Sequence, residues 1–251
     1  MTAEPAVQPT QSRAAFISGL VFFGFSLVFL GYLSWTLVNW VQDQQNAPIS
    51  QVKLYGNFQH LDAPALQHRL QQEYVGNFFT VNVDDVQQFL HQQHWVYQVA
   101  VRKQWPGTLV VVVTEQQPVA IWNAEHLLNK KGEVFTAPIA EVADTLPLLY
   151  GPQGAEQDAL KMFSNMQQLL QLHDFTVRKV WLTERFAWRL ELADGLLLQV
   201  GRDDTLKRLQ RFVDVYPTMQ QHNAAGMAEV DLRYDTGIAV RYAATDTKRK
   251  T

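Results

Sequence analysis

The sequence contains no cysteine, which excludes disulfide stapling, thiolate metal sites and cysteine nucleophiles. This absence does not fix the compartment, since a bacterial periplasm accommodates such a chain. A strong net charge is also missing: the formal net charge is −3, and both signs are interspersed along the chain. Because no basic stripe marks a phosphate-binding face, we expect no nucleic-acid partner.

Familiar catalytic motifs are missing as well, since the chain has no GxSxG elbow, P-loop, GxGxxG or HExxH sequence. His91 and His94 stand three residues apart on a predicted helix, but two ligands do not make a metal site. The acidic pairs 84–85 and 203–204 fall at predicted helix starts, where capping explains them. A glycosidase needs two carboxylates at a set separation, which a sequence does not show. We therefore predict no catalytic residue, metal, cofactor or small-molecule substrate.

Charge is absent from one long stretch, because the 29 residues between Arg13 and Asp43 carry none. A helix of that length reaches about 40 Å, whereas the hydrocarbon layer of a membrane is only ~30 Å thick. Trp35 and Trp40 lie near its C-terminal end, where aromatic rings favour the lipid–water boundary. We interpret residues 14–42 as a retained transmembrane helix, because the apolar core of a cleaved signal peptide would be only about 7–15 residues long.

The few charges that flank this helix indicate its orientation. Arg13 and the α-amino group precede it, whereas Asp43 follows it and Lys53 is the first cation beyond it. The positive-inside rule then places residues 1–13 in the cytoplasm and the bulk of the chain outside. We expect a single-pass membrane protein with its bulk outside the cytoplasm.

Residues 43–117, which include a linker, are predicted to form a β-α-α-β-β domain. Asp62 and Asn82 are expected to cap its two helices, and residues 105–107 to form the turn between its last two strands. Two helices covering one face of a small sheet are the economical packing. Such a sheet leaves an edge open to another chain. The expected strands are 49–55, 95–103 and 108–115.

Residues 118–243 are predicted to form a second domain, a mainly antiparallel sheet with helices, which makes the whole chain α+β. Asp194-Gly195 is a two-residue hairpin signal, and Pro217 is expected to stop the last helix. Residues 244–251 are predicted to be a flexible tail. The expected strands are 118–122, a hairpin over 127–135, 146–150, 175–183, 187–193, 196–200, 227–233 and 237–242; the expected helices are 154–173 and one that begins after 203–204.

Aromatic and arginine side chains gather near the predicted edges of this second sheet. Such residues are the usual anchors of protein–protein contacts, although ordinary strand packing with solvated arginines remains open for any one of them. They are Trp181, Arg185, Trp188, Arg189, Arg233, Tyr234, Arg241 and Tyr242.

Over nearly its full length the chain resembles the FtsQ/DivIB family of bacterial cell-division proteins. The segments that carry the resemblance are VRKQWP (101–106), Glu115, PVAIW (118–122), VGRD (200–203), RFV (211–213) and VDLRY (230–234). The resemblance implies a POTRA-type module and an essential-type scaffold without enzymatic activity. It also implies that the protein binds the coiled-coil proteins FtsB and FtsL in the periplasm, and links early division proteins to septal peptidoglycan synthesis.

The resemblance also implies where partners bind. In the family, the last strand and the turn before it take up a segment of FtsB. The POTRA-type module is associated with early recruitment, including contact with FtsK. The residues that match the FtsB site are Arg233, Tyr234, Thr236, Gly237 and Tyr242, with Arg185 on a neighbouring strand as a basic contact; those that match the recruitment site are Gln98, Val101 and Lys103.

Two other interpretations compete with a division scaffold. A membrane-anchored POTRA adaptor for protein export or outer-membrane assembly would use the same sheet edges. Tandem POTRA modules or a C-terminal barrel would favour that adaptor, and the sequence shows neither. An anchored cell-wall enzyme is the third possibility, and muropeptide turnover by purified residues 43–251 would reveal it.

Overall fold

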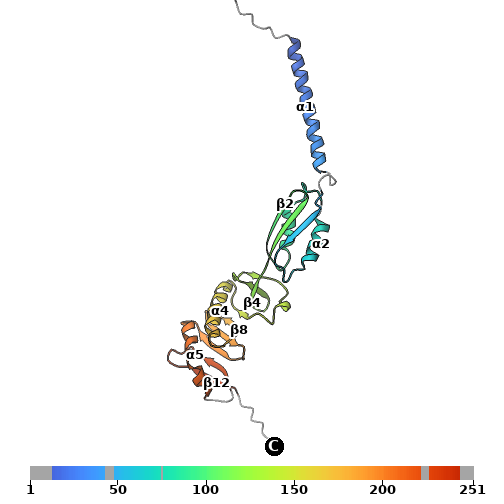
Figure 1. The fold of residues 1–251 in the computed structure, drawn as a ribbon. Coiled ribbons are helices and arrows are strands. Elements are labelled where there is room, and N and C mark those ends of the chain that lie inside the picture. The colour runs from blue at the N-terminus through green and yellow to red at the C-terminus, as the bar shows by residue number, and fades with distance from the viewer. Residues whose placement is uncertain (1–12, 43–47, 75, 222–225, 244–251) are drawn as a thin grey trace, which may run out of the picture. The chain divides into compact units, whose positions relative to one another are not determined.

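The computed structural model describes residues 13–42, 48–74, 76–221 and 226–243 (Figure 1). The chain divides into two compact units, Met1–Glu115 and Gln116–Thr251. The tail predicted for residues 1–13, apart from Arg13, lies outside the described residues, as does the tail at 244–251.

The charge-free stretch forms one continuous helix, α1 (Arg13–Gln42). Its segment Phe16–Val41 is long and apolar enough to cross a membrane, and none of it is buried inside the protein. Large apolar side chains such as Phe22 and Val28 are about 70% exposed. A helix that is apolar on all its faces, with its side chains exposed, is consistent with a single-pass membrane protein.

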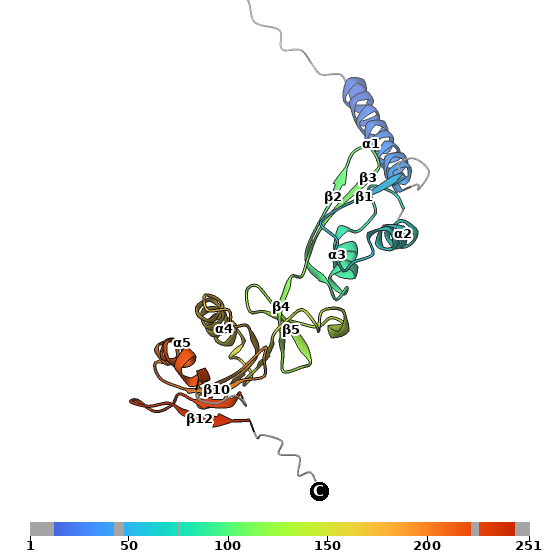
Figure 2. The same ribbon diagram turned by 60° about the horizontal axis from the view of Figure 1, so that its bottom comes forward.

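The first unit continues with the predicted β-α-α-β-β order, which is confirmed. Its three strands form a sheet of order β1-β3-β2, in which β1 runs parallel to β3 and β2 runs antiparallel to it. Figure 2 shows both helices on one side of these strands. The elements are β1 (Gln51–Tyr55), α2 (Ala63–Glu73), α3 (Val83–His91), β2 (Val96–Gln104) and β3 (Thr108–Glu115).

Both predicted helix caps are present in this domain. The Asp62 carboxylate accepts a hydrogen bond from the Ala65 N–H at 3.0 Å, and the Asn82 side chain accepts one from the Asp84 N–H at 3.0 Å. Such bonds satisfy backbone donors that the first helical turn leaves unpaired. The helices bury Leu70 and Leu90 completely, so the caps position the apolar faces over the sheet.

Glu115, at the end of β3, is a buried carboxylate that accepts hydrogen bonds from backbone N–H groups. Its two oxygens accept the N–H groups of Gln59 and Leu61 at 2.8 Å each and that of His60 at 3.3 Å, and the residue is only 8% exposed. A buried charge is tolerated when hydrogen bonds replace its hydration. Glu115 thus fastens the segment between β1 and α2 to the end of the central strand.

The second unit is one sheet of nine strands, with the order β12-β11-β10-β9-β8-β7-β4-β5-β6. The strands are β4 (Pro118–Trp122), β5 (His126–Asn129), β6 (Val134–Phe135), β7 (Leu148–Tyr150), β8 (Val177–Leu182), β9 (Trp188–Leu192), β10 (Leu197–Gly201), β11 (Met227–Asp231) and β12 (Ala239–Tyr242). The helices are the short 3-10 turn η1 (Ile139–Glu141), α4 (Glu156–Gln171) and α5 (Thr205–Gln221).

This sheet is mainly antiparallel but contains three parallel pairs, β4–β7, β7–β8 and β10–β11. Helix α4 connects β7 to β8, and α5 connects β10 to β11, as crossover connections between parallel strands require. Figure 2 shows α4 and α5 together on one side of the sheet. Their apolar faces bury Met166, Leu170, Leu209 and Phe212 against the strands.

Two local predictions in this domain are wrong in detail. The hairpin at Asp194-Gly195 has a three-residue loop, because the Leu192 N–H bonds to the Leu196 carbonyl at 2.9 Å; Gly195 takes the left-handed position with φ 89°. Pro217 does not stop α5, which continues to Gln221. Proline removes one N–H from the helical ladder, but Met219 in the next turn is buried, and its packing holds the final turn.

We predict that Glu115→Ala selectively destabilises the first domain. Three backbone N–H groups would lose a charged acceptor, which we expect to lower the free energy of unfolding by about 3 kcal/mol. Amide hydrogen exchange of the full chain would report this loss in residues 48–115 while leaving 116–221 unchanged. Thr114→Ala, at an exposed neighbour, is the matched control; equal exchange in the two variants would contradict the role assigned to Glu115.

Candidate functional site

Strand β12 forms one edge of the nine-stranded sheet. It pairs with β11 on one side, with Val230 opposite Val240 and Met227 opposite Tyr242, and no described strand lies on its other side. In Figure 2, β12 lies at the margin of the sheet, away from the helices α4 and α5. An edge strand presents unpaired N–H and C=O groups that another chain can extend.

The loop between β11 and β12 carries most of the residues predicted to bind a partner. Arg233, Tyr234, Thr236 and Gly237 all lie in it and are exposed, and the Tyr234 side chain, although aromatic, is 57% exposed. Tyr242 lies on β12 itself and is half-buried. The structure thus places five of the six predicted residues on one loop and the strand that follows it.

Arg185 does not lie on a neighbouring strand as predicted. It occupies the exposed turn between β8 and β9, because the chain reverses at Thr183, whose N–H bonds to the Ala187 carbonyl at 3.0 Å. This turn and Arg233 border the same surface groove, of about 390 Å³. The groove is lined by Trp181, Leu182, Thr183, Ala187, Trp188, Arg189, Gln199, Gly201 and Arg233.

A residue that the site predictions omitted holds the loop in place. The Arg211 guanidinium, on α5, donates to the carbonyl oxygens of Leu232 at 3.1 Å, Tyr234 at 2.7 Å and Asp235 at 2.6 Å. A planar group with five donors is suited to such multiple contacts. The short motif RFV, noticed only through the family resemblance, contains this arginine, but nothing in its local pattern signals a contact with a loop 20 or more residues away.

Two ion pairs restrain arginine side chains at the β11–β12 edge of the sheet. The Arg233 guanidinium donates to both oxygens of Asp231, at 2.9 and 3.1 Å from Nε, and these bonds hold the pKa of the Asp231 carboxyl below its usual range and raise the pKa of Arg233. Arg241 on β12 donates from Nε to Glu229 on β11 at 3.0 Å, and this bond, followed by one from Gln199, lowers the pKa of Glu229. Both arginines are mostly exposed, so solvent screens the pairs. Their main effect is to orient the guanidinium groups.

Gly201 at the end of β10 makes room for this arrangement. Its φ is 83°, and a Cβ there would lie 2.8 Å from a nitrogen of Arg208 and 3.1 Å from Cγ of Arg233. Only glycine combines that backbone conformation with the space that both arginines occupy. The residue therefore fixes the path of Arg233 along the sheet.

Other aromatic residues of the predicted group have different roles. Trp181 stacks on Tyr150, with ring centroids 5.7 Å apart, and the Arg189 guanidinium lies 4.2 Å from the Trp181 ring centroid. These three side chains lie on the sheet face that α4 and α5 leave uncovered. Trp188, in contrast, is only 6% exposed, so it packs in the core.

The three residues predicted for recruitment lie on β2, an edge strand of the first sheet, but not on one face of it. Gln98 is exposed, whereas Val101 packs against the core of the domain. The Lys103 ammonium donates to the Phe79 carbonyl at 3.1 Å. The side chains of Val101 and Lys103 therefore point toward the helix-covered face and that of Gln98 points away. What the three share is the backbone edge of β2.

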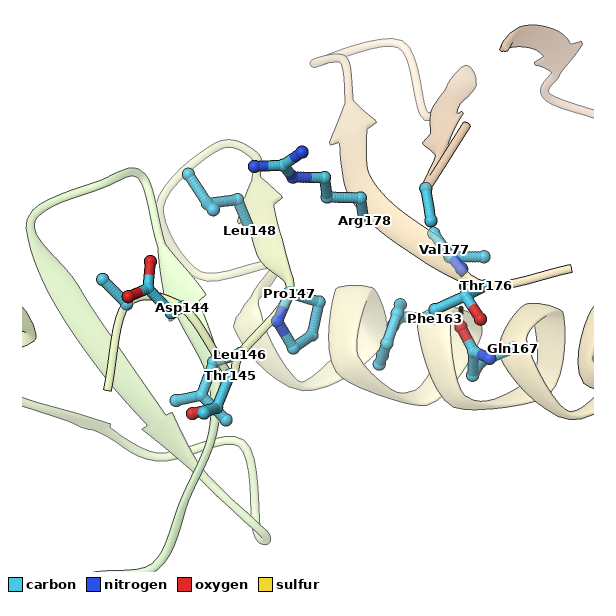
Figure 3. A pocket seen from close by; sticks show the side chains of 12 residues that line it. Asp144, Thr145, Leu146, Pro147, Leu148, Phe163, Gln167, Thr176, Val177 and Arg178 are labelled. Atoms are coloured by element: carbon cyan, nitrogen blue, oxygen red, sulfur yellow. Dashed lines mark hydrogen bonds between the residues drawn. The ribbon is translucent and has the colours of Figure 1, made fainter. Parts of the chain in front are cut away.

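The described residues form no metal-binding cluster. They contain no group of three or more His, Asp, Glu or Cys side chains able to hold a metal ion. A hollow of about 490 Å³ lies between the segment 143–148, α4 and the start of β8. Figure 3 shows the side chains that line it. Gln167, which interrupts the apolar stripe of α4, accepts the Val177 N–H there at 2.8 Å. This polar residue is explained by a structural hydrogen bond.

Comparisons with known proteins agree with this architecture and confirm the resemblance. Residues 47–116 match the family model "POTRA domain, FtsQ-type", and residues 120–233 match "Cell division protein FtsQ/DivIB, C-terminal". The chain is 38% identical to the cell division protein FtsQ of Shewanella oneidensis, covering 89% of this chain and 84% of that protein. It is 34% identical to that of Escherichia coli, over 96% and 90%, and 32% identical to that of Aliivibrio fischeri, over 93% and 91%.

We predict that Arg211→Lys loosens the loop between β11 and β12. A lysine ammonium cannot reproduce the planar, multiple contact with three carbonyls. A loss of ~1 kcal/mol of local stability would raise the rate of limited tryptic cleavage after Arg233 by about fivefold. Arg202→Lys, at an exposed position before α5, is the matched control. Unchanged cleavage in the Arg211 variant would show that the loop holds its shape without this side chain.

Proposed function

The chain belongs to the FtsQ/DivIB family of cell division proteins, and from this premise we propose that it is a non-enzymatic scaffold of the division machinery that binds FtsB and FtsL. In this role it links early division proteins to septal peptidoglycan synthesis. The observation that supports the proposal most directly is the open edge of β12 beside the exposed Tyr234. We propose that a segment of FtsB adds to this edge as a further strand.

Backbone pairing alone would not give such a site a specific partner. Each backbone hydrogen bond contributes a net ~0.5–1.5 kcal/mol, and β12 has only four residues. Burial of the Tyr234 ring, and charge-assisted bonds from Arg233 and from Arg185 across the groove, would supply the rest. The opposite edge of the same sheet, β6, has only two residues, which favours β12 as the docking strand.

We propose a second docking edge at β2 for early-arriving partners, including FtsK. Gln98, Val101 and Lys103 lie on both faces of this strand, so one flat contact surface would not include all three. A partner strand paired along the β2 backbone would touch all of them. At nine residues, β2 is also longer than either edge of the second sheet.

We further propose that the protein sits in the inner membrane with residues 1–13 in the cytoplasm, the two domains in the periplasm, and the whole at the division septum. The positive-inside bias supports this orientation. An alkaline phosphatase fused to the C-terminus should be active, because that enzyme needs an oxidising compartment for its disulfides. An inactive fusion would reverse the orientation.

For the β12 site, we predict that Tyr234→Ala weakens FtsB binding by about tenfold, equivalent to ~1.4 kcal/mol. The lost contribution is the burial of an aromatic ring that is exposed in the free protein. The measurement is a titration of the full chain, held in lipid nanodiscs, with an FtsB peptide.

Lys130→Ala is the control for this titration, because Lys130 is exposed in the turn after β5, far along the sheet order from β12. We expect that variant to bind like the unmodified chain. Equal losses of FtsB affinity in the two variants would contradict binding at the β12 edge.

For the β2 site, we predict that Gln98→Ala lowers the septal fraction of a fluorescent fusion about twofold, because it removes one side-chain contact beside the paired edge. Fluorescence microscopy of dividing cells gives this fraction. Gln88→Ala, an exposed glutamine on α3, is the matched control. If Gln98→Ala leaves the septal fraction unchanged while Tyr234→Ala lowers it, recruitment runs through the second domain instead.

A further inference from the structure

An exposed aromatic cluster lies at one end of the first domain. Phe78, Phe79 and Trp105 contact one another with ring centroids 5.5–6.1 Å apart. Phe79 and Trp105 are 44% and 65% exposed, and the Lys103 ammonium lies 5.9 Å from the Phe78 ring centroid. We call these four residues the tip cluster. Exposure of two large aromatic rings to water is unfavourable. The tip cluster is therefore a candidate contact surface for a partner.

The tip cluster flanks the point where the chain enters the domain. The Ile49 N–H bonds to the Gly76 carbonyl at 2.9 Å, just before Phe78. The Ser50 N–H bonds to the Gly107 carbonyl at 2.8 Å, just after Trp105. A Cβ at Gly107 would lie 2.6 Å from the Pro48 carbonyl oxygen, so glycine permits this close approach. The two loops that carry the aromatic rings are therefore fastened to residues 48–50.

Chain length keeps this end of the domain close to the end of α1. Five residues lie between Gln42, the last residue of α1, and Pro48. An extended chain advances at most ~3.6 Å per residue, so the six steps from Gln42 to Pro48 reach about 22 Å in all. The apolar segment Phe16–Val41 has 26 residues and spans about 39 Å, more than the ~30 Å of a hydrocarbon layer. If α1 spans the membrane, its last turns lie among the headgroups, and the tip cluster is within reach of the same surface.

We propose that the tip cluster rests in the headgroup layer of the membrane that α1 crosses. Tryptophan and other aromatic rings partition to this layer, since it accepts an apolar ring together with a polar edge. A lysine beside them suits a phosphate surface; its ammonium has three N–H donors, of which the Phe79 carbonyl takes one. The short tether keeps the surface at a high effective concentration, so a weak contact is enough to orient the domain.

Spin labels on the full chain test this proposal, which rests on the proposed membrane anchoring of α1. The absence of native cysteine allows one label at a time: at Thr80→Cys beside the cluster, at Gln92→Cys, an exposed residue directly after α3, and at Val28→Cys within α1. Each protein is placed at one copy per nanodisc of phosphatidylethanolamine and phosphatidylglycerol. Collision rates with oxygen, which enriches in lipid, and with a water-soluble nickel chelate are then measured.

We expect the label at position 28 to collide mainly with oxygen and the label at position 92 to collide mainly with the nickel chelate. At position 80, nickel collisions should be about threefold rarer than at position 92 and oxygen collisions more frequent, as for a site among headgroups. Adding Phe79→Ser and Trp105→Ser, which remove exposed rings only, should return the position-80 label to the values of position 92.

Nickel access at position 80 equal to that at position 92 would overturn the proposal. Shielding of position 80 from both reagents would overturn it too, because that result indicates cover by protein rather than lipid. A water-exposed label at position 28 would refute the anchoring of α1 itself. The failure of the anchor is thus distinguishable from the failure of the tip contact.

Discussion

The loop that leads into the edge strand β12 is held chiefly by one guanidinium group, that of Arg211. Strand β12 is joined to its sheet through β11, and the loop between them takes its shape from the three carbonyl groups that Arg211 of α5 holds. Helix α5 is itself the crossover between β10 and β11. Arg211, together with Arg208, whose guanidinium lies 3.5 Å from the Asp235 carboxylate, therefore couples the helix that completes the sheet to the loop that presents Tyr234. A loop fixed in this way before binding loses less conformational entropy when a partner docks.

Sequence reasoning recovered the local features of the fold and missed its long-range ones. Strand β3, the cap at Asp62 and the apolar helix α1 follow from short patterns whose physical cause lies within a few residues. The parallel pairing of β10 with β11 does not, because it depends on where α5 returns the chain. The predicted site residues fall on one loop and its strand because they are close in sequence. Arg211 is distant from that loop in sequence, and only the folded chain brings it there.

Both proposed docking edges carry the features by which natural sheets limit self-association. The pairing of β11 with β12 has a bulge between Met227 and Glu229, and β12 carries the exposed Arg241. The pairing of β2 with β3 has a bulge next to Gln98, and β2 carries Arg102 and Lys103. Bulges and cations on an edge discourage pairing with an identical copy. They leave the edge open to a partner of complementary charge, which is how an accessible edge becomes selective.

A membrane contact at the tip cluster would also set the distance of the β2 edge from the membrane surface. Strand β2 has nine residues; it begins at Val96 and ends at Gln104, beside Trp105 of the cluster. A strand advances about 3.3 Å per residue, so the whole edge would lie within ~30 Å of the headgroups. A partner anchored in the same membrane could reach such an edge with a short segment. Holding the domain by its tip would therefore present β2 to membrane-anchored partners without any rigid connection between α1 and the domain.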